Sequence, residues 1–429
     1  MNVLLKDIDI ITADSGIPFI KKGNIGICGD RIAFVRGSGE VPEGFKADRI
    51  IDGRHRLAMP GLVNAHTHCA MTLMRNMSDD LPLEEWLFDR IFPVEAKLTP
   101  ENVYWGTLLG IIEMVKSGTT AFADMYLHMD EVARAVVESG IRANLCRNPI
   151  KYENGKKCEP CDGFEYYRRW NGSANGRIRV YVEVHSTYLY TEESLKDAAQ
   201  LAKEYGTGIH IHLLETAKER EESIAKYGMD SVEICEKCGI FDVPVLAAHC
   251  VHLSEEDVEI LKAREVNVVH NPTSNLKLGS GIADIPRLIE RGISVSLGTD
   301  GASSNNNLNM FEEVHLAALI HKGVNRDPRL VSAEQAVMMA TANGSKAIGF
   351  GGETGCIKEG LKADLIILDT DKPHFYPMND PISAVVYAAQ GADVDTVIVD
   401  GSIIMEGREF KTVDEERVKF EVAEISKSI

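Results

Sequence analysis

The feature that most constrains the fold is an alternation of short apolar runs with amphipathic stretches between about residues 57 and 355 of the 429-residue chain. One amphipathic stretch, residues 99–118, carries helix signals: Thr99 as N-cap, Pro100 in the first turn and Gly118 as the stop. Strands that alternate with helices pair in parallel, and eight such units close into a ring. The pattern therefore predicts an α/β fold with a (β/α)8 TIM-like barrel. The eight apolar runs are PGLVNAHTH (60–68), TTAFADM (119–125), RANLCRN (142–148), RVYVEVHST (179–187), GIHIHLLE (208–215), VPVLAAHC (243–250), NVVHNPT (267–273) and ISVSLGTDG (293–301).

The two ends of the chain resemble each other and differ from the middle. Residues 1–56 alternate apolar and polar side chains between glycine-containing turns, and the pattern returns after residue 356. We expect both ends to pair into one small β-sandwich domain, 1–56 with 356–429, beside a catalytic barrel domain at 57–355. Residues 151–176, rich in Lys, Gly and Asn, are expected to form a long loop after the third strand.

The charge balance narrows the classes of partner. The chain has 46 Lys and Arg against 65 Asp and Glu, a formal net charge of −19. Such a surface repels phosphate backbones, so we expect no nucleic-acid polymer as partner but a neutral or cationic small molecule. No apolar run is long enough for a membrane span, and the N-terminus lacks the pattern of a signal peptide. We expect a cytoplasmic protein that does not bind membranes.

Four of the nine cysteines form two CxxC pairs, Cys158 with Cys161 and Cys235 with Cys238. Without a secretion signal, reduced thiols are the expectation. The first pair lies in the expected loop, where a redox role is the alternative to an ordinary loop position. The second pair has the i, i+3 spacing of a helix, and a structural zinc site is the alternative there.

Polar residues recur where the predicted strands end. The residues at these strand ends are, in chain order, His66 and His68, His185, His212 with Glu215, His249, His270 and Asp300. In such barrels the active site lies at the carboxyl ends of the strands. A single histidine there is most often structural. The convergence of so many on one rim indicates a functional site.

The spacing of these residues favours a metal. Residues i and i+2 of a strand point to the same face, so His66 and His68 can reach one ion. His212 joins them from the fifth strand, while His210 shares its face but lies deeper and is expected to fill the interior. Asp300 comes from the last strand, which lies beside the first in a closed barrel. Three imidazoles and a carboxylate suit Zn²⁺ or another borderline divalent ion and leave room for a water.

Longer motifs make the chain resemble the amidohydrolase superfamily. They are PGLVNAHTH, IHIHLLET, AAHCVHL, HNPTSNLKLGSG and LGTDGASSNN. Within that superfamily the chain is similar to the deaminases of 5′-methylthioadenosine, S-adenosylhomocysteine and 5′-deoxyadenosine. The stretches at 81–106 and 360–369 extend the similarity over nearly the whole chain.

The resemblance implies a metal-dependent hydrolase that converts an adenosine-type nucleoside to its inosine analogue and ammonia. It implies that His66, His68, His212 and Asp300 hold one divalent metal, most often Zn²⁺, with Fe²⁺ or Mn²⁺ as alternatives. No lysine stands on the fourth strand where two-metal relatives carry a carboxylated one, since His185 follows VYVEV. One metal per subunit is therefore expected.

The catalytic roles implied are those of Glu215, His249 and Asp300. Glu215 would protonate the purine N1, which makes C6 electrophilic, and Asp300 would take the proton of the attacking water. His249 would orient that water and stabilise developing negative charge. Cys69 and Cys250 each follow a site histidine and are expected to serve packing.

The substrate contacts implied are those of Glu95, Arg147, His185 and Trp86, together with Glu215 and Asp300. Glu95 would bind the ribose hydroxyls, Arg147 and His185 would hold the nucleoside, and Trp86 would form an aromatic wall in the long first loop. The alternatives are a surface-helix position for Glu95 and core packing for Trp86.

The loop after the third strand bears on the 5′ group of the substrate. Relatives that take S-adenosylhomocysteine grip its carboxylate with two arginines, and Arg147 fits the first. The expected loop has no second arginine but Lys156, Lys157 and Glu159. A lysine cannot reproduce a bidentate guanidinium contact, so we expect a preference for small 5′ groups. Alternatively, Arg147 only pairs with an acidic neighbour.

Two other functions stay open on the sequence. One is another deaminase or chlorohydrolase of the superfamily, of the guanine, cytosine or triazine type, with the same metal site. The other is a non-catalytic barrel used for binding or assembly, although the intact set of proposed ligands disfavours it. A homo-oligomer is expected, since such barrels commonly associate.

Overall fold

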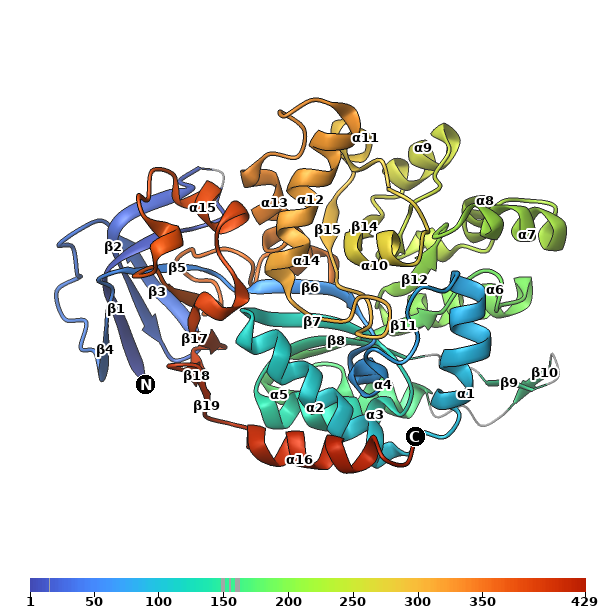
Figure 1. Ribbon diagram of the computed structural model, residues 1–429, viewed down its shortest axis with the longest axis horizontal. Helices are drawn as coiled ribbons and strands as arrows, with labels where there is room; N and C mark the ends of the chain where they lie inside the picture. The colour runs from blue at the N-terminus through green and yellow to red at the C-terminus, as the bar shows by residue number, and fades with distance from the viewer. Residues whose placement is uncertain (15, 148–150, 154–155, 159–162) are drawn as a thin grey trace.

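The computed structural model describes residues 1–14, 16–147, 151–153, 156–158 and 163–429. Eight parallel strands form a nearly closed barrel, each hydrogen-bonded to the next in chain order (Figure 1). This confirms the predicted barrel. The strands are β6 (Leu62–Thr67), β7 (Thr119–Met125), β8 (Arg142–Arg147), β11 (Ile178–Val184), β12 (Ile209–Leu213), β13 (Val245–His249), β14 (Asn267–His270) and β15 (Val295–Leu297).

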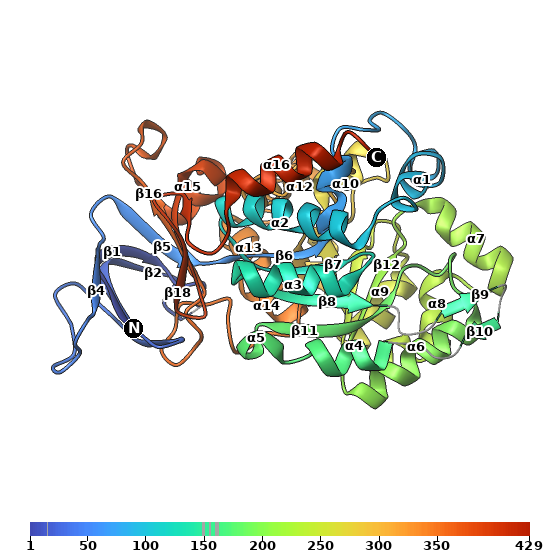
Figure 2. The same ribbon diagram turned by 90° about the horizontal axis from the view of Figure 1, so that it is seen from below.

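Helices surround the barrel and connect its strands (Figures 1 and 2). The expected caps of the helix after the first strand are confirmed: the Thr99 side chain accepts from the Asn102 N–H, and Gly118 has a positive φ of 90°. The helices are α1 (Phe92–Glu95), α2 (Pro100–Lys116), α3 (Met129–Ser139), α4 (Gly163–Trp170), α5 (Ser173–Gly176), α6 (Glu192–Tyr205), α7 (Ala217–Tyr227), α8 (Ser231–Lys237), α9 (Glu255–Ala263), α10 (Pro272–Lys277), α11 (Ile285–Glu290), α12 (Met310–Asn325), α13 (Ala333–Met339), α14 (Ala342–Ala347), α15 (Pro381–Tyr387) and α16 (Glu415–Ile425), with a 3₁₀ segment at Cys69–Met74 and a π segment at Glu85–Ile91.

The first and last barrel strands meet at the site end. The Asp300 N–H donates to the His66 carbonyl at 3.0 Å. Gly298 allows this approach, because a Cβ there would lie 2.9 Å from the His66 backbone nitrogen. The backbones that carry two of the proposed metal ligands are therefore joined directly.

The two chain ends form a separate sheet, as expected. Nine strands are hydrogen-bonded into one mixed sheet around an apolar core that includes Val3, Leu5, Ile25 and Leu365. In Figure 1 this sheet lies to the left of the barrel, while the terminal helix α16 packs against α2. The division at residues 56 and 356 stays a prediction, and β5 begins at the first of these and extends beyond it. The strands are β1 (Asn2–Ile11), β2 (Phe19–Cys28), β3 (Arg31–Arg36), β4 (Arg49–Asp52), β5 (Arg56–Pro60), β16 (Leu365–Asp369), β17 (Val394–Val399), β18 (Ser402–Glu406) and β19 (Glu409–Phe410).

A buried ion pair connects the barrel to the terminal sheet. Arg142, at the start of β8, has a side chain that is 0% exposed. Its Nε and Nη2 donate to the Asp364 carboxylate at 2.7 and 3.0 Å, and Nη2 lies 3.4 Å from Asp400 Oδ1. The guanidinium carbon also lies 5.0 Å from the ring centre of Phe350. This end of β8 is opposite to the end that faces the site.

The loop expected at 151–176 is only partly a loop. Strands β9 (Lys151–Glu153) and β10 (Lys156–Cys158) pair with each other, and Gly163–Trp170 forms α4. The helix forms because its aromatic residues find partners: Tyr166 is buried, and Tyr167 stacks on Tyr205 at 4.7 Å between ring centres. The loop expectation was therefore wrong for the helical part.

No helix among the described residues is long and apolar enough to cross a membrane. The cytoplasmic location and the homo-oligomeric state stay predictions.

Candidate metal centre and its pocket

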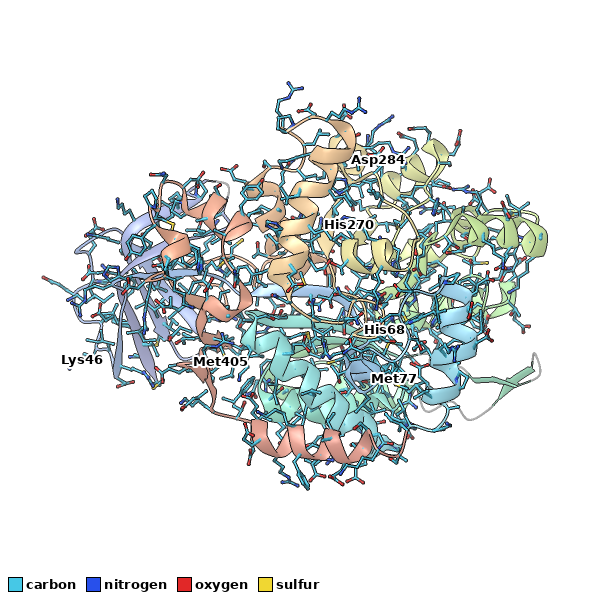
Figure 3. The ribbon with its side chains drawn as sticks, in the orientation of Figure 1. Lys46, His68, Met77, His270, Asp284 and Met405 are labelled. Atoms are coloured by element: carbon cyan, nitrogen blue, oxygen red, sulfur yellow. The ribbon has the colours of Figure 1, made fainter. Side chains whose placement is uncertain are left out.

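Five histidine side chains from four barrel strands meet inside one end of the barrel. The rings of His66, His68, His185, His212 and His249 lie 4.7–5.5 Å from their neighbours in the cluster, centre to centre. His68 is labelled within the barrel domain in Figure 3. Burial lowers the pKa of His66 to about 4 and that of His185 to about 3, so both imidazoles are neutral near pH 7.

His270 ends β14 but does not join this cluster. It packs against His321 of α12, with their Nε2 atoms 3.4 Å apart. The sequence placed it with the other strand-end histidines, whereas the structure places it with a covering helix.

The proposed ligands face one another at distances that suit a divalent cation. His212 Nε2 lies 3.2 Å from His68 Nε2, and Asp300 Oδ1 lies 3.3 Å from His68 Nε2 and 3.5 Å from His66 Nε2. Ligand atoms ~2.0–2.1 Å from a tetrahedral zinc ion are separated by about 3.3–3.4 Å. The distances in these three pairs therefore fit a bound divalent ion.

The protonation pattern gives an independent test of that fit. His68 Nδ1 lies 2.5 Å from the Met125 carbonyl and His212 Nδ1 lies 2.7 Å from the His185 carbonyl. Because each Nδ1 must donate, both Nε2 atoms turn lone pairs toward each other. His66 Nε2 is also buried without a hydrogen-bond partner. Lone pairs that converge beside a carboxylate suit a bound cation, which would compensate their burial.

The residues at the strand ends are held in unusual backbone conformations. Asp300, His249 and Leu214 have φ values of 62°, 73° and 48°, in the left-handed region that non-glycine residues rarely adopt.

Two serine hydroxyls orient the Asp300 carboxylate. Asp300 Oδ2 accepts from Ser274 Oγ at 2.6 Å and from Ser304 Oγ at 2.8 Å. These contacts turn Oδ1 toward the histidines.

Glu215 and His249 form the second pair of chemical groups. His249 Nε2 lies 3.8 Å from Glu215 Oε2, and Ser280 Oγ donates to Glu215 Oε1 at 3.0 Å. Burial raises the pKa of Glu215, which favours the protonated acid. Burial alone would lower the pKa of His249, but the carboxylates of Glu215 and Asp300 outweigh it and the pKa is raised.

A pocket opens directly above this centre. Trp86 comes from the π segment and Glu95 from the end of α1, both between β6 and α2, and burial raises the pKa of Glu95. The lining includes nearly all the substrate residues expected from the sequence. The lining residues are His68, Met71, Leu83, Trp86, Leu87, Phe92, Glu95, Met125, Tyr126, Leu127, Glu183, His185, Tyr188, His212, Glu215, His249, Leu278 and Asp300.

Arg147 is placed differently from the other substrate residues. It does not appear among the described residues that line the pocket. Its Nη1 lies 3.2 Å from Asp130 Oδ2, and its guanidinium carbon lies 5.1 Å from the Tyr166 ring centre. Its substrate role stays a prediction, and the acidic neighbour of the alternative interpretation is present. Lys156 and Lys157 lie in β10, while Glu159 is outside the described residues.

Several residues of the site were missed in the sequence. Asn275 Oδ1 lies 2.8 Å from His249 Nδ1, and Glu219 Oε2 accepts from the Glu215 backbone N–H at 3.1 Å. Burial raises the pKa of Glu219 to about 7. Tyr126 lines the pocket immediately after β7. Asn275 lies in HNPTSN, part of a motif shared with the amidohydrolase superfamily. That position was the signal by which the sequence could have placed Asn275 in the site.

The cysteine alternatives find no support in the described part of the chain. Neither of the two described groups of three metal-capable side chains contains a cysteine. Cys235 lies in α8 and Cys238 caps it, both with free buried thiols. Cys158 ends β10, and Cys161 lies outside the described residues. Cys69 and Cys250 are buried, as expected.

Comparisons with known proteins agree with the geometry. The model of the Amidohydrolase family matches residues 57–404. A protein of Acetivibrio thermocellus named 5-methylthioadenosine/S-adenosylhomocysteine deaminase is 61% identical over 429 residues, 100% of both chains. One of the same name from Thermoanaerobacter pseudethanolicus is 50% identical over 431 residues, 100% of this chain and 99% of the relative.

Solved structures of two deaminases are also similar to this chain over most of its length. An adenosine deaminase from Xanthomonas campestris with bound zinc has a TM-score of 0.94 at 30% identity, over 100% of this chain and 99% of that one. A guanine deaminase from C. acetobutylicum with bound guanine has a TM-score of 0.83 at 25% identity, over 94% of this chain and 100% of that one.

Proposed function

Because the chain belongs to the amidohydrolase family, we propose that it deaminates adenosine-type nucleosides with water, giving the inosine analogue and ammonia. The resemblance seen in the sequence is confirmed, and hydrolysis of a C–N bond is the reaction class of these deaminase relatives. The observation that carries the proposal is the pairing of a protonatable Glu215 with His249 beside a centre of converging lone pairs. The proposed substrates are 5′-methylthioadenosine, 5′-deoxyadenosine, adenosine and S-adenosylhomocysteine.

The family is metal-dependent, and we propose one divalent ion per chain, Zn²⁺ rather than Fe²⁺ or Mn²⁺. His66, His68, His212 and Asp300 would hold it. When bound, such an ion lowers the pKa of a water to about 7 and so supplies a nucleophile near neutral pH. The zinc in the Xanthomonas campestris structure supports this choice.

The chain's own residues move the protons. Glu215, whose pKa is raised by burial and which is hydrogen-bonded to Ser280, would donate a proton to the purine N1. Asp300 accepts a proton from the attacking water, and His249, oriented by Asn275, stabilises the charge that develops on the oxygen. Asp300 passes this proton to the amino group on C6, which leaves as ammonia, and the proton of the remaining hydroxyl returns to Glu215 as the C6 carbonyl forms.

The pocket holds the nucleoside above these groups. Glu95 would accept hydrogen bonds from the ribose hydroxyls, and Trp86 and His185 would enclose the nucleoside. Arg147, beside Asp130, would select weakly for a carboxylate tail, which favours small 5′ groups.

The decisive experiment follows the ultraviolet absorbance change that deamination causes in each substrate, with metal-assayed protein. The panel is adenosine, 5′-deoxyadenosine, 5′-methylthioadenosine, S-adenosylhomocysteine, guanine and cytosine. We expect turnover of the adenosines with about one metal per chain, and a higher kcat/KM for 5′-methylthioadenosine than for S-adenosylhomocysteine. Turnover of guanine or cytosine alone would favour the other deaminases, and metal-loaded protein inert on the whole panel would contradict the proposal. The reverse order of the two 5′-modified substrates would contradict only the tail preference.

A second experiment tests the proton donor. Glu215→Gln keeps the size of the side chain and an oxygen that can accept from Ser280, but it removes the acid. We expect kcat to fall about 10²–10⁴-fold with KM and metal content little changed. Ser280→Ala is the matched control, which keeps the acid and is expected to cost much less. Equal losses in the two variants would show that the acid is not the proton source.

A further inference from the structure

His210 lies under the metal centre, in contact with one proposed ligand. It is on β12 two residues before His212, on the same face of the strand, and its side chain is 0% exposed. Its Nε2 lies 2.8 Å from His66 Nδ1, the distance of a hydrogen bond between two imidazoles. The sequence indicated only a residue that fills the barrel.

The contact distinguishes His66 from the other imidazoles of the proposed centre. His68 and His212 use backbone carbonyls, those of Met125 and His185, to hold their second nitrogens. Those carbonyls are fixed by the barrel strands and their continuations. The His66 ring is instead held by a side chain, so its orientation depends on which residue stands at position 210.

The proton assignment that a metal at His66 Nε2 requires leaves His210 with an N–H that has no protein acceptor in the described structure. For His66 Nε2 to turn a lone pair toward the centre, His66 Nδ1 must carry the proton and donate it to His210 Nε2. His210 then carries its own proton on Nδ1, which is buried without a hydrogen-bond partner in the described structure. An unpaired buried N–H is unfavourable, and a leucine at this position would avoid it. A residue retained only for packing does not account for this arrangement.

The backbone of His66 is held in place, so only the orientation of its ring remains to be fixed. The Asp300 N–H donates to the His66 carbonyl, and the neighbouring Gly298 lies against the His66 backbone. With the backbone held by the last strand, rotation of the ring is the freedom that remains. The bond to His210 removes it.

We propose that His210 is a positioning residue: it orients the His66 imidazole so that Nε2 faces the metal. This inference rests on the proposed metal centre, and the experiment below separates the two.

The test compares His210→Leu with His210→Gln, using Zn²⁺ alone and a chromophoric chelator as competitor. Leucine fills the space without an acceptor, whereas the glutamine amide oxygen can accept from His66 Nδ1. We expect leucine to raise the Kd for Zn²⁺ about 10–100-fold and glutamine to keep it within a few-fold. The absorption spectrum of bound Co²⁺ should change with leucine and be largely restored with glutamine.

The stability of the metal-free protein separates positioning from a structural role. We expect metal-free His210→Leu to melt at or above the wild-type temperature, while its gain on adding Zn²⁺ is smaller. His270→Leu is the matched control, because His270 is a buried strand-end histidine outside the cluster. It should alter melting but not the Kd.

The outcomes are distinct. A wild-type Kd in His210→Leu would overturn the inference, as would a weakened Kd that glutamine fails to rescue. A weakened Kd accompanied by an equally destabilised metal-free protein would assign His210 to the fold alone and also overturn it. If the wild-type protein itself binds no metal, the proposed centre and the proposed function fail first.

Discussion

Asp300→Asn is expected to lower kcat/KM about 10⁴-fold. The asparagine oxygen can still accept from Ser274 and Ser304, but the amide nitrogen cannot accept from the Gly301 N–H, which donates to Asp300 Oδ1 at 2.8 Å. The asparagine side chain also carries no negative charge and cannot take the proton of the attacking water. The same change removes the anionic member of the proposed ligand set, so we also expect weaker metal retention. Steady-state kinetics on 5′-methylthioadenosine with parallel metal analysis measure both effects.

The matched control for this prediction is Ser304→Ala. It removes one hydrogen bond to Asp300 but leaves the carboxylate in place, and we expect a loss of roughly 10-fold. An Asp300→Asn protein that keeps full metal and more than a tenth of the wild-type rate would show that another group accepts the proton.

Arg142→Ala is expected to destabilise the protein by about 3–5 kcal/mol. The change leaves Asp364 buried and unpaired at the junction of the barrel and the terminal sheet, where Arg142 donates two hydrogen bonds to it. Urea unfolding followed by circular dichroism measures the loss. The kinetics of the protein that remains folded should be close to wild type, since Arg142 lies at the end of β8 away from the pocket.

A double variant tests the cause of that loss. Arg142→Met with Asp364→Asn removes both charges while keeping an acceptor for the Asp400 N–H, which Asp364 binds at 2.7 Å. We expect the double variant to be more stable than Arg142→Ala alone. If the single change costs less than about 1 kcal/mol, the pair behaves like an exposed one and does not hold the two parts together.

The sequence predicted which side chains come together where one periodicity governs both strand and cluster. His66 and His68 share a face because a strand repeats every two residues, and the carboxyl ends of the barrel strands place His212 and Asp300 nearby. These features follow from the repeat of a strand and from the closure of eight strands into a ring. Both can be predicted from the pattern of a single sequence.

The sequence failed where neighbouring elements decide the direction of a side chain. His185 and His270 both end strands that are buried on both faces, so the pattern cannot tell which points to the interior. In the structure His270 meets His321 of α12 instead. His210 looked like a filling residue because its partner, His66, lies on a strand more than 140 residues earlier. The helix at Gly163–Trp170 packs on the ring of Tyr205, which lies 38 residues after Tyr167 and on another helix.

The hydrogen bond that joins Asp300 to His66 has a consequence for how the protein is made. The first proposed ligand is synthesised early and the last one only after more than half of the chain has followed. No partial ring can assemble the complete centre, so tight binding of a metal should begin only when the final strand docks beside the first. Tight metal binding would then report that the last step of folding is complete. A chain that ends before Asp300 should be unable to hold the ion tightly.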